Sequence, residues 1–216
     1  MLYIVSTPIG NLEDMTLRAI RTLKEVDLIT AEDTSHVQIL LRKYEINTPV
    51  MSYHSYSGNE KLEKIVNLLK EGKSVAVVSD AGTPGISDPA YSLIKRAIEE
   101  GVKIVPIPGA SSLLAALVMS GKPMHNFLYL GFLPLKKGRQ TLLKSLAEEH
   151  RTIVIFEAPH RILRTLENLK EYLGDRDIAV CREITKIYEE ALRMKISEAI
   201  VHFTKTKPRG EFVLVI

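Results

Sequence analysis

The sequence contains no tryptophan, a single cysteine and only 6% aromatic residues among its 216 positions. One cysteine, Cys181, cannot form an intrachain disulfide, and its place in a predicted strand indicates a small buried apolar side chain. The few aromatic residues are not interleaved with basic ones, which argues against a base-stacking strand of the kind that binds single-stranded nucleic acid.

Long apolar runs are absent too. No window approaches the about 18 apolar residues of a membrane span, and the N-terminal MLYIVSTPIG lacks the basic segment and the length of a signal peptide. The composition, 45% apolar and 25% charged, is that of an ordinary globular protein with a sizeable core. We therefore expect a soluble, cytoplasmic protein with no membrane partner.

The spacing of residues argues against a metal site and against a nucleotide-binding loop. The six histidines are scattered, and no Cys or His pair has ligand spacing, so we expect no metal. The segment EGKS at 71–74 contains the Gly-Lys-Ser of a phosphate-binding loop, but Asn67 stands where its first glycine belongs, and the loop follows a helix rather than a strand. A Gly-x-Gly-x-x-Gly fingerprint is also missing.

Charge is nearly balanced, with 29 basic and 26 acidic residues and a formal net charge of +3. This balance only weakly indicates a polyanionic partner. Basic residues do cluster locally, at Lys136, Lys137 and Arg139 and again at Lys205, Lys207 and Arg209. These clusters are either nucleic-acid contacts or ordinary solvated loop charges.

Apolar runs alternate with helical periodicities through the first hundred residues, which predicts βαβ units and a mostly parallel sheet. The expected strands are LYIV, DLIT, SVAVVS and the start of VKIVPIPG, with amphipathic helices between them. One of these helices has clear ends, because Asp88 can cap it, Pro89 suits the first helical position, and Gly101 suits the left-handed site after its end.

The second half of the chain predicts a different sheet. FLYLGF, TIVIF, IAVC and EFVLVI are expected strands, with helices starting near Ser111, Arg139, His160 and Ser197. Several connections are too short for helical crossovers, so this sheet should be mixed. Because the chain exceeds the usual single-domain length of roughly 100 to 150 residues, we expect two α/β domains, 1–108 and 109–216.

Three loops rich in glycine and proline follow predicted strands: STPIGNLEDMT from Ser6, SDAGTPGISDP from Ser79 and PIPGASS from Pro106. Open parallel sheets bind ligands beyond the carboxyl ends of their strands. Glycines there let the main chain approach a ligand closely, and prolines reduce the flexibility of the loops. The pattern predicts a stiff wall around a flat ligand, with tight βα turns as the alternative.

Seven motifs occur in a distinctive order: VSTPIGNLEDMT, AEDT, VVSDAGTPGISDP, PIPGAS, FEAPHR, CREITKIYEE and KPRGEFVLVI. Together they span essentially the whole chain and resemble the ribosomal RNA branch of the tetrapyrrole methylase superfamily. The resemblance implies two α/β domains, with S-adenosylmethionine in the cleft between them, and a homodimer. It also implies 2′-O-methylation of a cytidine in the decoding region of 16S ribosomal RNA, either free or within the small ribosomal subunit.

Carried onto this sequence, the resemblance implies a set of residues that contact the cofactor: Pro8, Ile9, Gly10, Asp80, Ala81, Gly82, Thr83, Gly85, Ile86, Ser111, Ser112, Glu157, Ala158 and Gly210. Arg161 and Arg182 suit phosphate contacts, because a planar guanidinium binds two oxygens at once. With Lys136, Lys137 and Arg139 they form the predicted RNA-binding set.

A ribose hydroxyl must lose its proton to become a good nucleophile, so a general base is expected. The candidate catalytic residues are Glu32 and Asp33 of AEDT and Glu183 with Lys186 of REITK. Asp80 is also considered as the base, with orientation of backbone or cofactor as an equal alternative. Asp33 has an alternative role as the cap of the following helix.

This chain also departs from the family pattern. Ser35 stands where an arginine is frequent, which removes one possible phosphate contact, and Ala90 stands where a glycine is frequent. Many members continue past the final strand with a small helical domain, and we expect its RNA contacts to be dispensable or replaced here. The alternative functions are C-methylation of a precorrin- or uroporphyrinogen-type tetrapyrrole, and RNA or nucleotide binding without catalysis.

Overall fold

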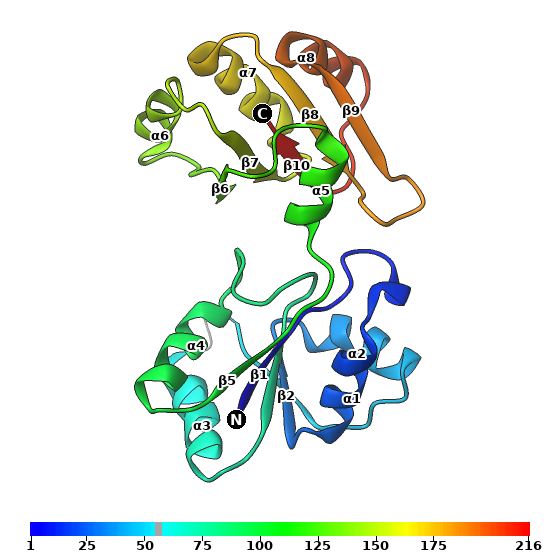
Figure 1. The fold of residues 1–216 in the computed structure, drawn as a ribbon, viewed down its shortest axis with the longest axis vertical. Coiled ribbons are helices and arrows are strands. Elements are labelled where there is room, and N and C mark those ends of the chain that lie inside the picture. Colours follow the sequence, from blue (N-terminus) through cyan, green and yellow to red (C-terminus); the bar gives the residue numbers. More distant parts are fainter. Residues whose placement is uncertain (55–57) are drawn as a thin grey trace. The chain divides into compact units, whose positions relative to one another are not determined.

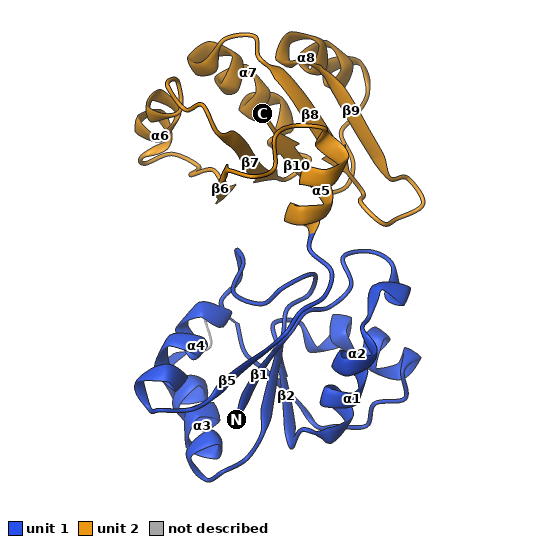
Figure 2. Cartoon of the chain, viewed as in Figure 1, with its two compact units in different colours: residues 1–111 blue, residues 112–216 orange. Residues whose placement is uncertain are grey.

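A computed structural model describes residues 1–54 and 58–216 of the chain. Contacts divide it into two compact units, Met1–Ser111 and Ser112–Ile216 (Figure 2). The sequence-based boundary lay between 108 and 109, in the segment that follows the last strand of the first unit. Each unit has its own hydrophobic core and is described separately.

Unit 1, residues 1–111, is built on a five-stranded parallel sheet with the order β3-β2-β4-β1-β5. The strands are β1 (Leu2–Val5), β2 (Leu28–Ala31), β3 (Val50–Ser52), β4 (Val75–Val78) and β5 (Ile104–Ile107). Helices α1 (Leu17–Glu25) and α2 (Thr34–Lys43) pack on one face, and α3 (Gly58–Lys70) and α4 (Ala90–Glu99) on the other (Figure 1). A 3-10 turn, η1 (Leu12–Asp14), precedes α1. Because both faces are covered, the strands carry continuous apolar runs rather than alternating patterns.

The ends of α4 are close to the sequence-based expectation. The helix begins at Ala90, one position after the predicted Pro89, and Asp88 Oδ1 accepts the N–H of Ala90 at 2.9 Å. The same oxygen accepts the N–H of Gly85 at 2.8 Å, so Asp88 joins the preceding loop to the helix. Gly101 follows the helix with φ +71°, as predicted for the left-handed position.

Unit 2, residues 112–216, contains a second five-stranded sheet with the order β6-β7-β10-β8-β9. Its strands are β6 (Phe127–Phe132), β7 (Thr152–Glu157), β8 (Asp177–Arg182), β9 (Glu190–Lys195) and β10 (Phe212–Val215). The pair β6 and β7 is parallel and the other pairs are antiparallel, so the predicted mixed sheet is confirmed.

The two faces of the second sheet are covered by different helices. α6 (Arg139–Ser145), α7 (Ile162–Leu173) and α8 (Ile196–Lys205) bury the main core, which includes Leu166, Phe203 and Phe212. α5 (Ser112–Ser120) covers the other face, where Cys181 Sγ contacts the carbonyl oxygen of Ala116 at 3.8 Å. Cys181 is buried as expected, and burial raises the pKa of its thiol to about 11.

Two strands were not predicted from the sequence, and both lie at sheet edges. β3 has only three residues, and β9, with the sequence EALRMK, is half exposed and carries charges. Edge strands are short and charged because this discourages pairing with other chains, which also weakens their sequence signal. Within the described residues, no helix is both long and apolar enough to cross a membrane.

Candidate functional site

The carboxyl ends of the unit 1 strands carry the three glycine- and proline-rich loops. Thr7, just after β1, and Gly82, after β4, form an isolated antiparallel bridge. Thr7 N–H donates to Gly82 O at 2.9 Å, and Gly82 N–H donates to Thr7 O at 3.1 Å. The Thr7 hydroxyl also donates to Ser79 O at 3.0 Å. The first and second loops are therefore joined through their main chains.

The third loop also lies close to the first, at Gly109 and Ser6. A Cβ placed on Gly109 would lie 3.0 Å from Ser6 Cβ and 3.4 Å from Ser6 O. Ser6 N–H donates to Ile107 O at 3.1 Å, and the Ser6 hydroxyl lies 2.9 Å from that of Thr83. Gly82 has φ +79°, which L side chains rarely adopt. Close approach at Gly109 and the left-handed turn at Gly82 explain why glycine stands at these two positions.

Acidic side chains gather beside these loops. Glu32 and Asp88 line a small pocket together with Tyr53, and Asp80 Oδ1 accepts the N–H of Asp33 at 3.2 Å. Partial desolvation raises the pKa of the Glu32 carboxyl, the nearby charges of Asp80 and Asp88 raise it further, and His54 opposes them. This end of the sheet therefore carries a negative potential.

Asp33 has a structural role. Its Oδ1 accepts the N–H of Ser35 at 2.8 Å and that of His36 at 3.2 Å, which caps α2. These hydrogen bonds lower the pKa of the Asp33 carboxyl, which makes it a weaker proton acceptor. The capping alternative for Asp33 is confirmed, while a role of Glu32 as general base stays a prediction.

In unit 2, the FEAPHR motif forms a buried charged network at the end of β7. Glu157 is 1% exposed, and its Oε1 accepts the N–H of Ala158 at 2.8 Å and pairs with Arg161 Nε at 3.1 Å. Its Oε2 accepts the hydroxyl of Thr165 at 2.5 Å. The carboxylate is thus bound within the unit, so a cofactor contact at Glu157 or Ala158, which stays a prediction, would use main-chain atoms.

Arg139 extends this network. Its guanidinium donates to Asn168 Oδ1 at 2.9 Å, Thr165 Oγ1 at 2.9 Å and Pro134 O at 3.1 Å, and the residue is only 5% exposed. Arg161 also donates to Leu133 O at 2.6 Å. Burial lowers the pKa of Arg139. The geometry does not favour RNA contact by Arg139, whereas the neighbouring Lys136 and Lys137 are exposed.

The CREITK and KPRGE motifs meet at the ends of β8 and β10. Glu183 has φ +51°, and its Oε1 lies 3.0 Å from Lys186 Nζ. A Cβ on Gly210 would overlap Glu183 Oε1 and Cδ, so any other residue at this position would require the Glu183 side chain to move. Arg182 Nε pairs with Glu190 Oε2 at 2.6 Å. Gly210 was predicted only as a cofactor residue, and its contact with Glu183 was missed.

The structure places the predicted site residues in two groups. One lies on unit 1: Pro8, Ile9, Gly10, Glu32, Asp33, Asp80, Ala81, Gly82, Thr83, Gly85, Ile86 and Ser111. The other lies on unit 2: Ser112, Lys136, Lys137, Arg139, Glu157, Ala158, Arg161, Arg182, Glu183, Lys186 and Gly210. The predicted site residues did not include Ser6 and Thr7, whose side chains hold the unit 1 loops in place, and Asp88 was predicted only as a helix cap. Hydroxyl side chains at strand ends are a usable signal. In the described part of the chain, no group of His, Cys, Asp and Glu residues could hold a metal ion.

Comparison with known proteins shows the family to which the chain belongs. Residues 1–200 match the family described as Tetrapyrrole (Corrin/Porphyrin) Methylases. The chain is 51% identical over 215 residues to Ribosomal RNA small subunit methyltransferase I of Thermotoga maritima, covering 100% of this chain and 97% of that protein. It is 49% identical over 218 residues to the protein of the same name from Synechocystis sp., covering 100% of this chain and 78% of that protein.

Among solved structures, a diphthine synthase superposes with a TM-score of 0.78 at 16% identity, over 100% of this chain and 88% of that chain. At this identity the likeness concerns the fold alone, and it confirms the fold class expected from the motifs. The family match and the full-length relatives confirm the resemblance read from the sequence: the chain belongs to the tetrapyrrole methylase family.

Proposed function

We propose that the protein transfers a methyl group from S-adenosylmethionine to the 2′ oxygen of a cytidine in the decoding region of 16S ribosomal RNA. The observation that carries the proposal is the edge of unit 1, where two loops are joined through their main chains and acidic side chains lie beside them. Relatives that are about 50% identical over the full length of the chain are named as ribosomal RNA methyltransferases. Relatives named in this way favour RNA over a tetrapyrrole as the acceptor.

The charge and the glycine content of the unit 1 loops support this choice of cofactor. S-adenosylmethionine carries a positive sulfonium and an ammonium group, and the edge beside the loops carries Glu32, Asp80 and Asp88. The close main-chain path through Gly82 leaves a wall with few projecting side chains. When bound, S-adenosylmethionine supplies an electrophilic methyl group. Cover from unit 2, by Ser112, Glu157, Ala158 and Gly210, stays a prediction.

The protein's remaining tasks are to align the ribose hydroxyl and to remove its proton. Glu32 is the best-placed base on unit 1, because its raised pKa makes the carboxylate a better proton acceptor than an ordinary glutamate. Glu183, held against Lys186, is the second candidate. Replacing each in turn distinguishes them.

We assign RNA binding to basic side chains of unit 2 that are exposed or half-buried. Lys136 and Lys137 are exposed, and Arg182 is half-buried at the end of β8 beside Glu190. With few aromatic side chains to stack on bases, recognition would depend on shape and phosphate contacts, with the target nucleotide drawn out of its stack. We further expect a cytoplasmic homodimer that acts on the assembled small subunit or on its free RNA.

The test is to incubate the protein with labelled S-adenosylmethionine and undermethylated small subunits, and then to digest the RNA to nucleosides. Label on 2′-O-methylcytidine is the expected result. Label found only on an added uroporphyrinogen-type tetrapyrrole would refute the proposal and favour ring methylation. Saturable cofactor binding without transfer to either acceptor would favour a non-catalytic binding module.

A further inference from the structure

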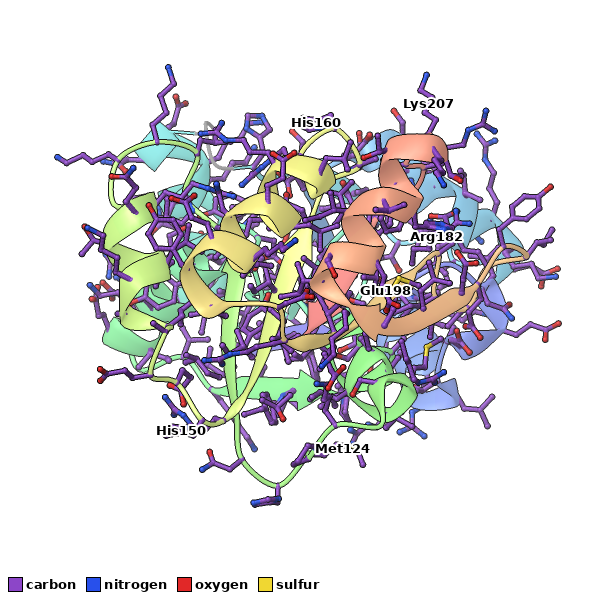
Figure 3. The ribbon with its side chains drawn as sticks, turned by 90° about the horizontal axis from the view of Figure 1, so that it is seen from above. Met124, His150, His160, Arg182, Glu198 and Lys207 are labelled. Carbon is purple, nitrogen blue, oxygen red and sulfur yellow. The ribbon has the colours of Figure 1, made fainter. Side chains whose placement is uncertain are left out.

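Unit 2 contains a second basic site at the opposite end of its sheet. A cavity of about 530 Å³ opens where β6, β7 and β8 begin, and its lining includes Lys122, His125, Glu149, His150, Arg151 and Arg176. Figure 3 shows His150 and Met124 at one edge of this unit, with His160 and Lys207 at the opposite edge (Figure 3). Strands rise about 3.3 Å per residue, which separates this end of β7 from Glu157 by roughly 17 Å.

The cations of the cavity differ in how their charges are balanced. Arg151 forms a paired contact with Glu149, at 2.9 Å from Nε and 2.7 Å from Nη2, so these two charges cancel. Arg176 donates to the carbonyl oxygens of Leu173, Glu149 and Ala147 at 3.1, 3.0 and 2.6 Å. Carbonyl groups are neutral, so these bonds fix the guanidinium in place but leave its charge uncompensated.

Lys122 is likewise held by a carbonyl group, although the nearby Asp177 carboxylate offsets part of its charge. Its Nζ donates to the carbonyl oxygen of Asp177 at 2.7 Å, while the Asp177 carboxylate pairs with Lys195 at 2.9 Å. Burial lowers the pKa of Lys122, and the charges of Lys195 and Arg176 lower it further against the opposing effect of Asp177. Two fixed cations side by side, each held by neutral carbonyls, form a site that an anion would stabilise.

We propose that this basic cavity binds a phosphate group, either of a free nucleotide or of an RNA chain. Arginine and lysine are the usual phosphate partners in proteins. The volume lies within the range of about 300 to 1,000 Å³ for small-molecule sites and leaves room for a sugar beside the phosphate. The histidines His125 and His150 are exposed at the same cavity and can donate further hydrogen bonds. The proposal does not depend on the methyl-transfer reaction.

Calorimetric titration of the full chain with inorganic phosphate and with ribose 5-phosphate tests the site, since neither probe carries the adenine of the methyl donor. We expect saturable binding that weakens about ten-fold in Lys122→Gln, because a charge-assisted hydrogen bond is lost while the amide can still reach Asp177 O. Arg151→Gln, at an exposed position, should also weaken binding, because it leaves the Glu149 charge unpaired. Lys144→Gln is the matched control, an exposed lysine of α6 outside the cavity, and should bind as the unmodified protein does.

The source of the phosphate follows from two further measurements. If it belongs to RNA, a short oligoribonucleotide displaces ribose 5-phosphate, and Lys122→Gln raises KM for small subunits more than it lowers kcat. If it belongs to a free nucleotide, the oligoribonucleotide does not compete. The proposal is overturned if no probe binds saturably, or if Lys122→Gln binds as tightly as Lys144→Gln. Phosphate binding by a protein that fails to methylate RNA would refute the proposed function alone.

Discussion

The contact between Gly210 and Glu183 predicts a specific energetic coupling between the KPRGE and CREITK motifs. In Gly210→Ala the new Cβ would lie 2.3 to 2.6 Å from three atoms of the Glu183 side chain, where ordinary contacts begin near 3.4 Å. The Glu183 side chain must therefore move, and we expect this displacement to disrupt its ion pair with Lys186. Alanine at φ +80° adds a strain of about 1 kcal/mol, and losing a partly exposed ion pair costs up to about 1 kcal/mol more.

We therefore expect Gly210→Ala to lower the free energy of unfolding by about 2 kcal/mol in urea titrations. In a Glu183→Ala background the new Cβ meets no carboxylate, so the same change should cost only the strain of about 1 kcal/mol. Gly138→Ala, at φ +81° with nothing within 4 Å of its Cβ position, is the control for strain alone. Equal costs of Gly210→Ala in the two backgrounds would refute the reasoning, because a double-mutant cycle would then show no coupling.

Three further predictions concern the candidate site. Glu32→Gln should lower kcat about 100-fold or more if Glu32 is the base. It should also remove the acid limb of the pH–rate profile. Because the pKa of Glu32 is raised, this limb should lie at a higher pH than for an ordinary glutamate. An unchanged kcat would exclude Glu32 as the base. Gly82→Val should abolish binding of S-adenosylmethionine in calorimetry while the circular dichroism spectrum is retained, because valine is strained at φ +79° and adds a branched side chain to the wall. Undiminished affinity would contradict the placement of the wall. Arg139→Leu should destabilise unit 2 by about 3 kcal/mol in urea titrations, because buried polar partners lose their donor, whereas Lys137→Gln should leave stability unchanged and weaken RNA binding in filter assays.

Much of the fold was predictable because both sheets bury continuous apolar strands. β1, β4 and β7 each carry an unbroken run of apolar residues that few other structures accommodate. β3 and β9 escaped prediction because an edge strand needs no such run, and β9 alternates charged and apolar side chains at partly exposed positions. The amino-acid pattern therefore reveals strands that are buried, and it does not reveal strands that are partly exposed.

Site residues were predictable where the local backbone conformation requires a particular residue type. They were less predictable where side chains that are far apart in the sequence come into contact. Gly82 and the cap at Asp33 follow from local conformation, which a short segment encodes. Arg139 stands next to two exposed lysines in sequence, yet its guanidinium turns inward to Asn168 and Thr165 on α7. The approach of Gly210 to Glu183 depends on the antiparallel pairing of β10 with β8. Partners of this kind are fixed by topology, which local sequence does not encode.

The main-chain bridge between Thr7 and Gly82 has a consequence for how this fold changes over evolutionary time. The loop edge of unit 1 is held by main-chain hydrogen bonds at Thr7 and Gly82 and by a few short polar side chains, such as those of Ser6 and Asp88. Replacing an exposed residue such as Ala81 would leave these main-chain hydrogen bonds in place. A surface held mainly by main-chain hydrogen bonds can keep its contour when exposed side chains around it change. Specialisation for one acceptor can then arise from substitutions elsewhere, without rebuilding this edge.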